Sequence, residues 1–375
     1  MTTINRRTFH RCLVTAAMAG AVEEFTHATA MPAAEEAERS GALTDVPGIR
    51  VGHVTDTRRP TGCTAILFAS EATAGVDYDG SAPGSHLGVL LNPVSPIDKI
   101  HGMLLTGGGP MALEAVGGAV RYLQERMIGY DWGVPDTRVP IVVGAVIDDL
   151  MVVNDPKVRP DAEAAYKACS VASSAPIEEG NVGVGAGGTV GKMLSSSGYG
   201  GMKGGLGTAS LRLGDAVIGA MAVLNAVGDV VDWRTGKIVA GARRPDGKGF
   251  VRLVDVLKER AARGPEAALR IFDTPLRSTT LVVMATNIDF TKTQLTKLAM
   301  MASTGAARCI NPYHTNSDGD STFALSTNQL KSDLSVSVVG SLAAEVVSEA
   351  VLRAVKMAKS IEGWPAFRDY TLRLP

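Results

Sequence analysis

The sequence contains few of the residues that form metal centres and disulfide frameworks. Its four cysteines, Cys12, Cys63, Cys169 and Cys309, are far apart and form no Cys-x-x-Cys pair, which argues against a zinc knuckle or a thioredoxin-like redox site. The six histidines form no i, i+4 pair of the kind that binds zinc from a helix. We therefore expect neither a metal nor a cofactor.

No charge of one sign dominates, since 37 lysines and arginines face 38 aspartates and glutamates, a formal net charge of −1. No basic excess points to nucleic acid or to an anionic membrane surface. Hydrophobic residues make up 45% of the 375 residues and charged residues 20%, which excludes an intrinsically disordered chain. Outside the N-terminus we find no apolar stretch of about 18 residues, so we expect no membrane span in the mature protein.

The N-terminus has the features of an export signal. Arg6 and Arg7 precede a mildly apolar run at 12–22, and Ala-Thr-Ala at 28–30 is a small-x-small cleavage pattern. The run is shorter than the roughly 20 residues that a membrane span needs. Because twin arginines with weak hydrophobicity resemble a twin-arginine signal, we expect residues 1–34 to be removed and the protein to be periplasmic or secreted. The alternative is a frayed N-terminus on a cytoplasmic protein.

Beyond Leu43, short β-rich runs alternate with glycine-rich turns and periodic helices. Strands are expected at 48–54, 64–68, 87–93, 101–109, 139–147, 213–232, 277–287 and 321–327. Helices are expected at 111–126, 160–172, 291–310 and 341–358. This mixture without an internal repeat predicts one layered domain of the α/β (α+β) class, with its main break in the charged stretch 241–275.

Two glycine motifs suggest nucleotide binding but lack its context. Residues 183–188 read GVGAGG, yet no strand precedes them and no acidic residue follows about 20 positions later. Residues 186–193 approach a phosphate-binding loop, but Ala186 replaces its first glycine and Met193 replaces the Ser or Thr that would hold magnesium. We interpret these glycines as positions where two backbone layers approach closely.

Four polar features stand in separate parts of the chain: Ser-Thr-Thr at 278–280, Asp-Gly-Asp at 318–320, Asn225 in AVLNAVGD and Lys192 in GTVGKM. Together with GIRVGH, LLTGGG, RPDAEAAY and STTLVVMATN, they resemble a family of self-processing amidohydrolases. This family includes the L-aminopeptidase/D-amino-acid esterases, the β-peptidyl aminopeptidases and the nylon-oligomer (aminohexanoate-oligomer) hydrolases. The resemblance runs over residues 43–358, and HTNSDGDSTFAL is most similar to the nylon-oligomer hydrolase branch.

The resemblance implies a four-layer α-β-β-α sandwich, similar to the N-terminal-nucleophile hydrolases but not identical in connectivity. It also implies a precursor that cuts itself between Ser278 and Thr279. The products are an α subunit, 43–278, and a β subunit, 279–375, which fold together as a single domain. Relatives assemble as four such units, so we expect an (αβ)4 homo-oligomer that acts on small peptides or linear amides.

Cleavage of this kind creates the catalyst. A threonine hydroxyl is a weak nucleophile at neutral pH, but a freed α-amine with a pKa of about 7.7 to 8.0 is suited to act as its base. By the resemblance, Asp318 and Asp320 orient the nucleophile Thr279 and its amine. Asn225 is the oxyanion donor, and Lys192 places positive charge beside it. Taken singly, the aspartates read as a turn, the asparagine as a turn residue and the lysine as a surface residue.

Four positions depart from the family pattern. Ser278 stands where the nylon hydrolases have Asn and other members have Gly, which leaves the cleavage rate open. Asp148 in VIDDL replaces a usual tyrosine; we expect it to bind a substrate ammonium, and the alternative is that it caps a loop. Pro110 and Met111 in GGGPMALEA replace part of a Gly-Gly-Ser-x-x-Gly-Leu motif and are expected to reshape a pocket wall.

Two other functions remain open at this point. One is an unprocessed, catalytically inactive member that acts as a binding protein, with Ser278 blocking cleavage and Asp148 disabling the pocket. The other is acetyl transfer, since the ornithine acetyltransferases share the layered architecture and self-cleavage, although their local motif differs from Ser-Thr-Thr-Leu-Val-Val. Among hydrolases, the sequence does not separate α-peptide, β-peptide, D-amino-acid ester and nylon-oligomer substrates.

Gel electrophoresis of the purified protein separates the self-processing hydrolase from the inactive binding protein. A self-processing hydrolase yields a C-terminal fragment of 97 residues, 279–375, whose N-terminal sequence starts at Thr279. An inactive binding protein stays in one piece. An intact backbone through 277–281 in fully active material would contradict the expectation of self-cleavage.

Overall fold

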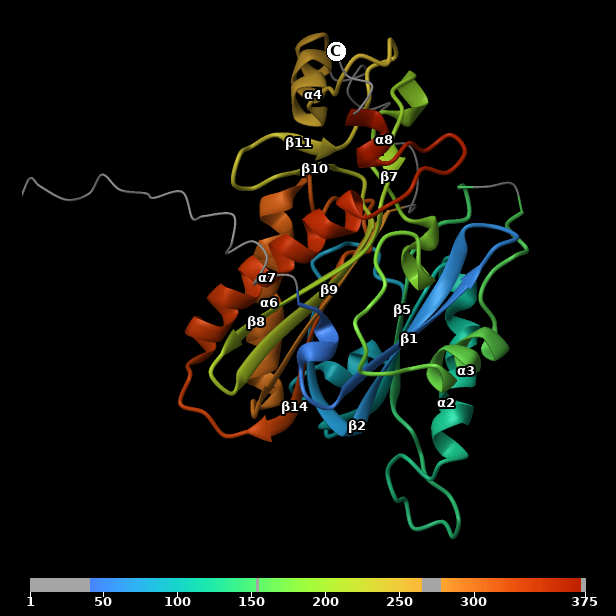
Figure 1. Cartoon of the computed structure of the whole chain (residues 1–375), viewed down its shortest axis with the longest axis vertical. Coiled ribbons are helices and arrows are strands. Elements are labelled where there is room, and N and C mark those ends of the chain that lie inside the picture. Colours follow the sequence, from blue (N-terminus) through green and yellow to red (C-terminus); the bar gives the residue numbers. More distant parts are fainter. Residues whose placement is uncertain (1–40, 153–154, 265–277, 372–375) are drawn as a thin grey trace, which may run out of the picture. The chain divides into compact units, whose positions relative to one another are not determined.

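The computed structural model describes residues 41–152, 155–264 and 278–371, all within one compact unit, Arg39–Pro375 (Figure 1). Its strands are β1 (Ile49–Asp56), β2 (Thr61–Asp77), β3 (Ser85–His86), β4 (Lys99–Thr106), β5 (Val142–Val146), β6 (Thr189–Val190), β7 (Met202–Lys203), β8 (Gly205–Leu213), β9 (Ala216–Asn225), β10 (Asp229–Val231), β11 (Ile238–Ala240), β12 (Thr279–Ile288), β13 (Ile310–Asn311) and β14 (Ser321–Leu330). Its α-helices are α2 (Val116–Gln124), α3 (Ala162–Ser170), α4 (Leu253–Ala262), α6 (Lys292–Cys309), α7 (Val336–Lys356) and α8 (Phe367–Thr371). Its 3₁₀ helices are η1 (Leu43–Asp45), η2 (Gly88–Leu91), η3 (Pro110–Ala115), η4 (Gly183–Gly187) and η5 (Ser195–Ser197).

Several expectations fall outside the described residues. They are the export signal at 1–34, Arg277 at the start of the strand expected at 277–287, and positions 265–275 of the expected break. No helix in the described ranges combines the length and apolar character that crossing a bilayer requires.

The long strand β2 joins the two halves of a nine-stranded mixed sheet with the order β3-β5-β4-β2-β14-β12-β9-β8, β1 pairing with β2 beside this path. The first half of β2 pairs with β1 and β4. A register shift between Leu67 and Ala72 follows, and residues 73–77 pair with β14. Because a bulge bends the strand that carries it, β2 turns the sheet from one layer into the next.

Three hydrophobic clusters separate four layers. One lies between α6 and α7 and the strands β8, β9, β12 and β14, and a second lies between the two halves of the sheet. The third lies between β2, β4 and β5 and the helices α2 and α3. Figure 1 shows the two helix pairs on opposite sides of the strands. The expected α-β-β-α sandwich is therefore confirmed.

Side chains of β12 alternate between two of these cores, as the period of a strand requires. Val282 and Met284 pack toward α6 and α7, whereas Leu281 and Val283 pack toward the other half of the sheet. Helix α6, which follows β12, begins with a capping box: Gln294 N donates to Thr291 Oγ1, and Thr291 N donates to Gln294 Oε1. The alternating β-branched residues therefore fix which faces of β12 are buried, and the capping box fixes where α6 begins.

Three predicted elements differ from the structure. The strand expected at 87–93 is wrong: Leu87 adopts φ 54° and residues 88–91 form η2. The β-rich run 213–232 is interrupted by a turn at Gly214, φ 60°, and continues as β9 and β10. The described part of the stretch 241–275 contains α4, whose first backbone N–H, on Leu253, donates to the buried Asp229. A short apolar run thus does not distinguish a strand from a 3₁₀ helix, and a charged stretch does not distinguish a linker from a helix.

Candidate active site

Thr279 and Asn225 face each other across two central strands. Thr279 is the first residue of β12 and Asn225 the last of β9, and the antiparallel register pairs them directly. Directly opposed residues in an antiparallel pair project from the same face of the sheet. Both side chains are buried, with Asn225 0% and Thr279 7% exposed. The sheet therefore brings the expected nucleophile and the expected oxyanion donor to one point.

The bond between residues 278 and 279 lies against the Asp-Gly-Asp turn. Ser278 forms a parallel bridge with Asp318, and Gly319 N donates to Ser278 O at 2.9 Å. The Thr279 hydroxyl donates to the same Ser278 oxygen at 2.7 Å. A Cβ on Gly319 would lie 2.9 Å from Thr279 Oγ1, so the hydroxyl sits directly against this glycine. Two donors thus converge on the carbonyl oxygen that precedes Thr279.

Asp320 fixes the backbone on the other side of Thr279. Its Oδ1 accepts from Thr280 N at 2.6 Å, and its Oδ2 accepts from His314 N at 3.1 Å. Both oxygens are therefore used to hold main chain. Asp320 thus holds the residue that follows Thr279, and its expected role in orienting the nucleophile stays a prediction.

Asp318 is the more perturbed of the two carboxyls. Its Oδ2 accepts from Thr315 N and Oγ1 at 3.1 and 2.6 Å, while its Oδ1 is buried without a hydrogen-bond partner among the described residues. Burial, and after it the charge of Asp320, raise the pKa of Asp318 to about 6 against the opposing effects of the Thr315 hydrogen bonds and Lys192. Asp318 consequently titrates close to neutral pH.

Lys192 reaches the site from the glycine segment that follows η4. Gly191 adopts φ 67°, which turns the chain, and Lys192 N donates to Val227 O at 3.0 Å. Lys192 Nζ donates to Asn225 Oδ1 at 2.7 Å and to Asn225 O at 3.0 Å. Burial lowers the pKa of Lys192 to about 7, and the nearby carboxylates, Asp318 first, oppose the shift. Lys192 is thus half-buried and bonded to Asn225, and its catalytic role stays a prediction.

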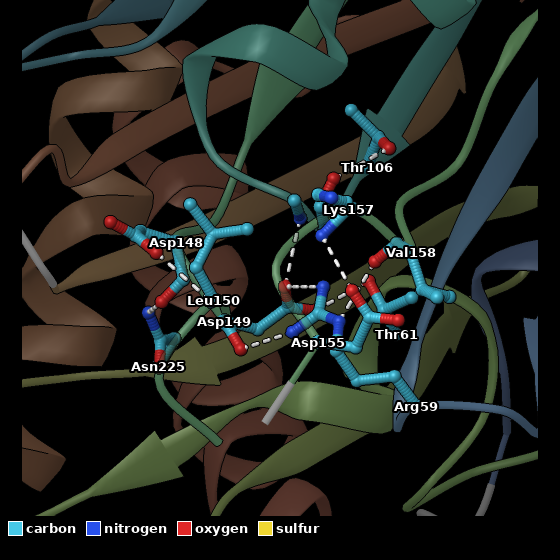
Figure 2. A network of polar contacts seen from close by, with 12 residues as sticks. Arg59, Thr61, Thr106, Asp148, Asp149, Leu150, Asp155, Lys157, Val158 and Asn225 are labelled. Atoms are coloured by element: carbon cyan, nitrogen blue, oxygen red, sulfur yellow. Dashed lines mark hydrogen bonds and ion pairs between the residues drawn. The ribbon is translucent and has the colours of Figure 1, made fainter. Parts of the chain in front are cut away.

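The amide of Asn225 has a fixed orientation. Its Oδ1 accepts from Lys192 Nζ and from Thr189 N and Oγ1, the last two at 3.2 Å. Its Nδ2 donates to Asp148 O at 2.9 Å, as Figure 2 shows. Because the acceptor end is held from two sides, the donor end is presented on the opposite side. Described residues therefore hold both the oxygen and the nitrogen of this amide, and the oxyanion role of Asn225 stays a prediction.

The three residues expected to bind substrate, Asp148, Pro110 and Met111, lie in the segments 107–111 and 147–150, outside the two central strands. Asp148 Oδ1 accepts from Leu150 N at 3.0 Å, which is the loop-capping alternative, while its main-chain carbonyl meets Asn225. A Cβ on Gly109 would lie 3.7 Å from Asp148 Cγ, so Asp148 borders the loop that leads into η3. Pro110 and Met111 open η3 and are exposed, Met111 to 52%.

Sequence reasoning missed a buried ion pair beside the site. Arg59 and Asp149 are both 0% exposed, and Arg59 Nη2 lies 2.7 Å from Asp149 Oδ1. Thr61 Oγ1 and Gly108 N also donate to this carboxylate at 2.7 and 2.8 Å (Figure 2). The pair ties the turn before β2 to the ends of β4 and β5. In the sequence, the only nearby indication of this ion pair was a second aspartate, Asp149, directly after Asp148.

The glycines at 183–188 lie where layers meet, as interpreted from the sequence. A Cβ on Gly185 would lie 2.5 Å from Leu206 N, and one on Gly188 would lie 2.3 Å from Leu224 O. The interpretation as close backbone approach is confirmed. Across the described ranges, no three histidine, cysteine, aspartate or glutamate side chains are grouped as metal ligands would be.

The sequence is similar to one protein family over most of its length. The profile of "Peptidase family S58" matches residues 41–366. An uncharacterized aminopeptidase of Mycobacterium tuberculosis (strain ATCC 25618 / H37Rv) is 35% identical over 363 residues, which cover 88% of this chain and 97% of the relative. A 6-aminohexanoate-oligomer endohydrolase of Kocuria sp. (strain KY2) is 30% identical over 327 residues, covering 83% and 85%.

Solved structures share the fold. A beta-aminopeptidase of Burkholderia sp. superposes with a TM-score of 0.59 at 22% identity, covering 90% of this chain and 94% of that one. An L-aminopeptidase D-Ala-esterase/amidase of Ochrobactrum anthropi, described as a new variant among the Ntn hydrolase fold, gives a TM-score of 0.60 at 23% identity, covering 85% and 86%. These similarities confirm the expected relationship to the Ntn hydrolase fold.

Gly319 provides a test of the packing against the Thr279 hydroxyl. An alanine Cβ at this position would meet Ala82 O at 2.5 Å and Thr279 Oγ1 at 2.9 Å, so Gly319→Ala must displace the hydroxyl. We expect cleavage of the 278–279 bond, followed on gels, to slow by about 10². The control is Gly117→Ala in α2, where a Cβ meets nothing within 4 Å. Equal cleavage rates in the two variants would show that the hydroxyl position does not matter.

Proposed function

Since this chain belongs to peptidase family S58 and is a hydrolase of peptide or amide bonds, we propose that it cuts itself between Ser278 and Thr279 and then uses the Thr279 hydroxyl as its nucleophile. The observation that carries the proposal is the geometry of the 278–279 bond. The hydroxyl of Thr279 and the backbone N–H of Gly319 both donate to the Ser278 carbonyl oxygen. The nucleophile thus lies beside the bond it is proposed to break.

In the self-cleavage step, Thr279 Oγ1 attacks the carbonyl carbon of Ser278. The carbonyl oxygen becomes an oxyanion, and Gly319 N is already placed to donate to it. The C–N bond then breaks, the hydroxyl proton passes to the departing nitrogen of Thr279, and an ester links Ser278 to Thr279 Oγ1. Water hydrolyses this ester, leaving a carboxylate on Ser278 and restoring the hydroxyl. No external cofactor is needed for this balance.

In the mature enzyme, the α-amine of Thr279 serves as the base for its own hydroxyl. An α-amine has an ordinary pKa of about 7.7 to 8.0, so roughly a tenth or more of it is unprotonated at neutral pH and can accept the hydroxyl proton. Asp318 and Asp320 stand on either side of Gly319, next to Ser278 and Thr280, and we assign their negative charges to the stabilisation of this amine. The hydroxyl attacks a substrate amide, releases its amine and leaves an ester on Thr279, which water hydrolyses.

Asn225 and Lys192 stabilise the negative charge that develops on the substrate carbonyl. Lys192 Nζ at 2.7 Å from Asn225 Oδ1 draws electron density from the amide, which makes Nδ2 a stronger donor. One oxyanion donor is worth about 2.7 to 4 kcal/mol in enzymes of this mechanism. Asn225 ends the strand that pairs with Thr279, and Lys192 is bonded to Asn225.

The proposed substrates are small peptides or linear amides. Relatives carry the names aminopeptidase and 6-aminohexanoate-oligomer endohydrolase, and both kinds of substrate contain an amide bond and a free amine. Asp148 is half-buried at the same site, and we assign it to the substrate ammonium in addition to its loop contact. Pro110 and Met111 then form the outer wall. A panel of p-nitroanilides and linear amide oligomers identifies the class.

Export and assembly belong to the same proposal. The twin arginines Arg6 and Arg7 support export to the periplasm or beyond. The family resemblance supports a homo-oligomer of αβ units, as an (αβ)4 assembly. Light scattering and cell fractionation test these two points independently of activity.

Replacing the Thr279 hydroxyl by a methyl group tests the nucleophile. Thr279→Val keeps the shape of the buried side chain but removes the attacking oxygen, so we expect no 279–375 fragment on gels and no hydrolysis of any panel substrate. Thr279→Ser is expected to retain both.

Thr280→Val is the matched control, since Thr280 Oγ1 is buried without a hydrogen-bond partner among the described residues and its side chain faces away from that of Thr279. Turnover by Thr279→Val at the wild-type rate would overturn the proposed function.

The pH dependence of kcat reports the two perturbed charges. Asp318 is ionised above its pKa of about 6, and Lys192 is protonated below its pKa of about 7. These two groups therefore make activity rise through the first value and fall through the second, while deprotonation of the Thr279 α-amine raises activity up to about pH 8 in every variant. Lys192→Arg keeps a positive charge at every assay pH, so we expect a lower kcat without the alkaline limb. An alkaline limb unchanged in Lys192→Arg would assign it to another group.

A further inference from the structure

A second lysine lies behind the site with its charge completely enclosed. Lys203 in β7 is 0% exposed, and its Nζ donates to Gly185 O, Gly188 O and Gly204 O at 3.0, 2.8 and 3.0 Å. An amine has three N–H donors only in its protonated form, so these three carbonyls hold an ammonium ion. Burial lowers the pKa of Lys203 to about 7, and the charge of Asp149 opposes this shift. The ammonium therefore has a counter-charge in the Arg59-paired carboxylate.

One of the three carbonyls leads directly to Asn225. Gly188 O accepts from Lys203 Nζ at 2.8 Å, and the N–H of the same peptide group, on Thr189, donates to Asn225 Oδ1 at 3.2 Å. The register of β6 with β7 pairs Thr189 with Lys203, which keeps the peptide and the ammonium in place. A single peptide group thus connects a buried positive charge to the amide of Asn225.

This connection has an electrostatic consequence. A charge that binds the carbonyl end of a peptide polarises the group and strengthens its N–H as a donor. The Thr189 N–H then draws electron density from Asn225 Oδ1, on the same oxygen that Lys192 Nζ contacts at 2.7 Å. Two lysines, one direct and one through a peptide, act on one amide.

We propose that Lys203 is a positioning residue for the oxyanion-binding amide of Asn225, acting through the Gly188–Thr189 peptide. This inference rests on the proposed function, in which Asn225 stabilises the oxyanion. Lys203 fixes the angle of the Thr189 N–H and keeps it polarised toward Asn225. The Nδ2 donor is thereby held in place for the developing charge, where preorganised dipoles are most effective.

The chain contains a matched control for this arrangement. Lys292 in α6 is also buried, and its Nζ donates to Leu90 O, Asn92 O and Ser95 O at 3.0, 3.3 and 3.1 Å. Burial lowers the pKa of Lys292 as well. Asn92 and Ser95 are each followed by proline, so two of these peptides have no N–H to pass the polarisation on. Lys292 therefore makes three carbonyl contacts as Lys203 does, but none of these carbonyls belongs to a peptide group that contacts Asn225.

The experiment compares Lys203→Met with Lys292→Met in the full-length, self-processed protein, using a hydrolysed p-nitroanilide or amide oligomer from the panel. Each variant leaves three carbonyls without a donor, so both should lose thermal stability to a similar degree. Assays are run at least about 10 °C below each midpoint. We expect kcat to fall about tenfold in Lys203→Met with KM within about twofold, and both constants to stay within about twofold in Lys292→Met. Lys203→Arg, which keeps the charge, should recover part of the loss.

A second measurement separates positioning from general damage. In the Asn225→Ala background, Lys203→Met should reduce kcat no further, because the amide on which it acts is gone. If Lys203→Met does not fold, Lys203→Gln, which is neutral but keeps two donors, carries the same comparison. Equal kcat values in the Lys203 and Lys292 variants, or a full additive loss in the Asn225→Ala background, would overturn the inference. The proposed function would still stand after either result, since it is tested separately by Thr279→Val and by the state of the 278–279 bond.

Discussion

The direct pairing of Thr279 with Asn225 is the constraint on which this site depends. Side chains alternate along a strand, so a slip of one residue between β9 and β12 would place Asn225 on the opposite face from the hydroxyl. The register is secured by burial on both faces, because Val282 packs under the helices while Val283 packs between the sheet halves. Two hydrophobic cores with no chemical role thus determine where the two proposed catalytic groups meet.

Around this pair, the protein keeps several charges out of water. Isolated buried charges are costly, and they persist here because each is paired or surrounded by hydrogen bonds. Asp149 illustrates this, since Arg59, Thr61 and Gly108 all donate to its carboxylate. Lys203 is instead surrounded by carbonyls of the glycine segment. Glycine is required there because a Cβ on Gly187 would lie 2.4 Å from Asp149 Oδ2. The GVGAGG motif, which suggested nucleotide binding, therefore packs against the buried charges of Lys203 and Asp149.

Local patterns predicted the regular elements around the site, and they did so for physical reasons. The β-branched run after Ser278 and the Thr291 cap identify β12 and α6, because period and capping act within a few residues. Leu87–Pro93 misled because a short apolar run does not distinguish a strand from a 3₁₀ turn. Asn225, Lys192 and the two aspartates came from family resemblance, whereas Arg59 and Asp149, 90 positions apart, left no joint signal. Contacts between distant residues require the fold to be known.

The position of β12 has a further consequence for how the protein is made. This strand lies inside the sheet, hydrogen-bonded to β9 on one side and to β14 on the other. A cut before its first residue would free a terminus without freeing the strand, because both ladders still hold it. The two subunits, which end at Ser278 and begin at Thr279, would stay paired through these strands. If they dissociated, they would no longer have the peptide bond that aligned them during folding. Unfolding of the cut protein would then be irreversible. Its lifetime would be set by the rate of unfolding and not by an equilibrium free energy.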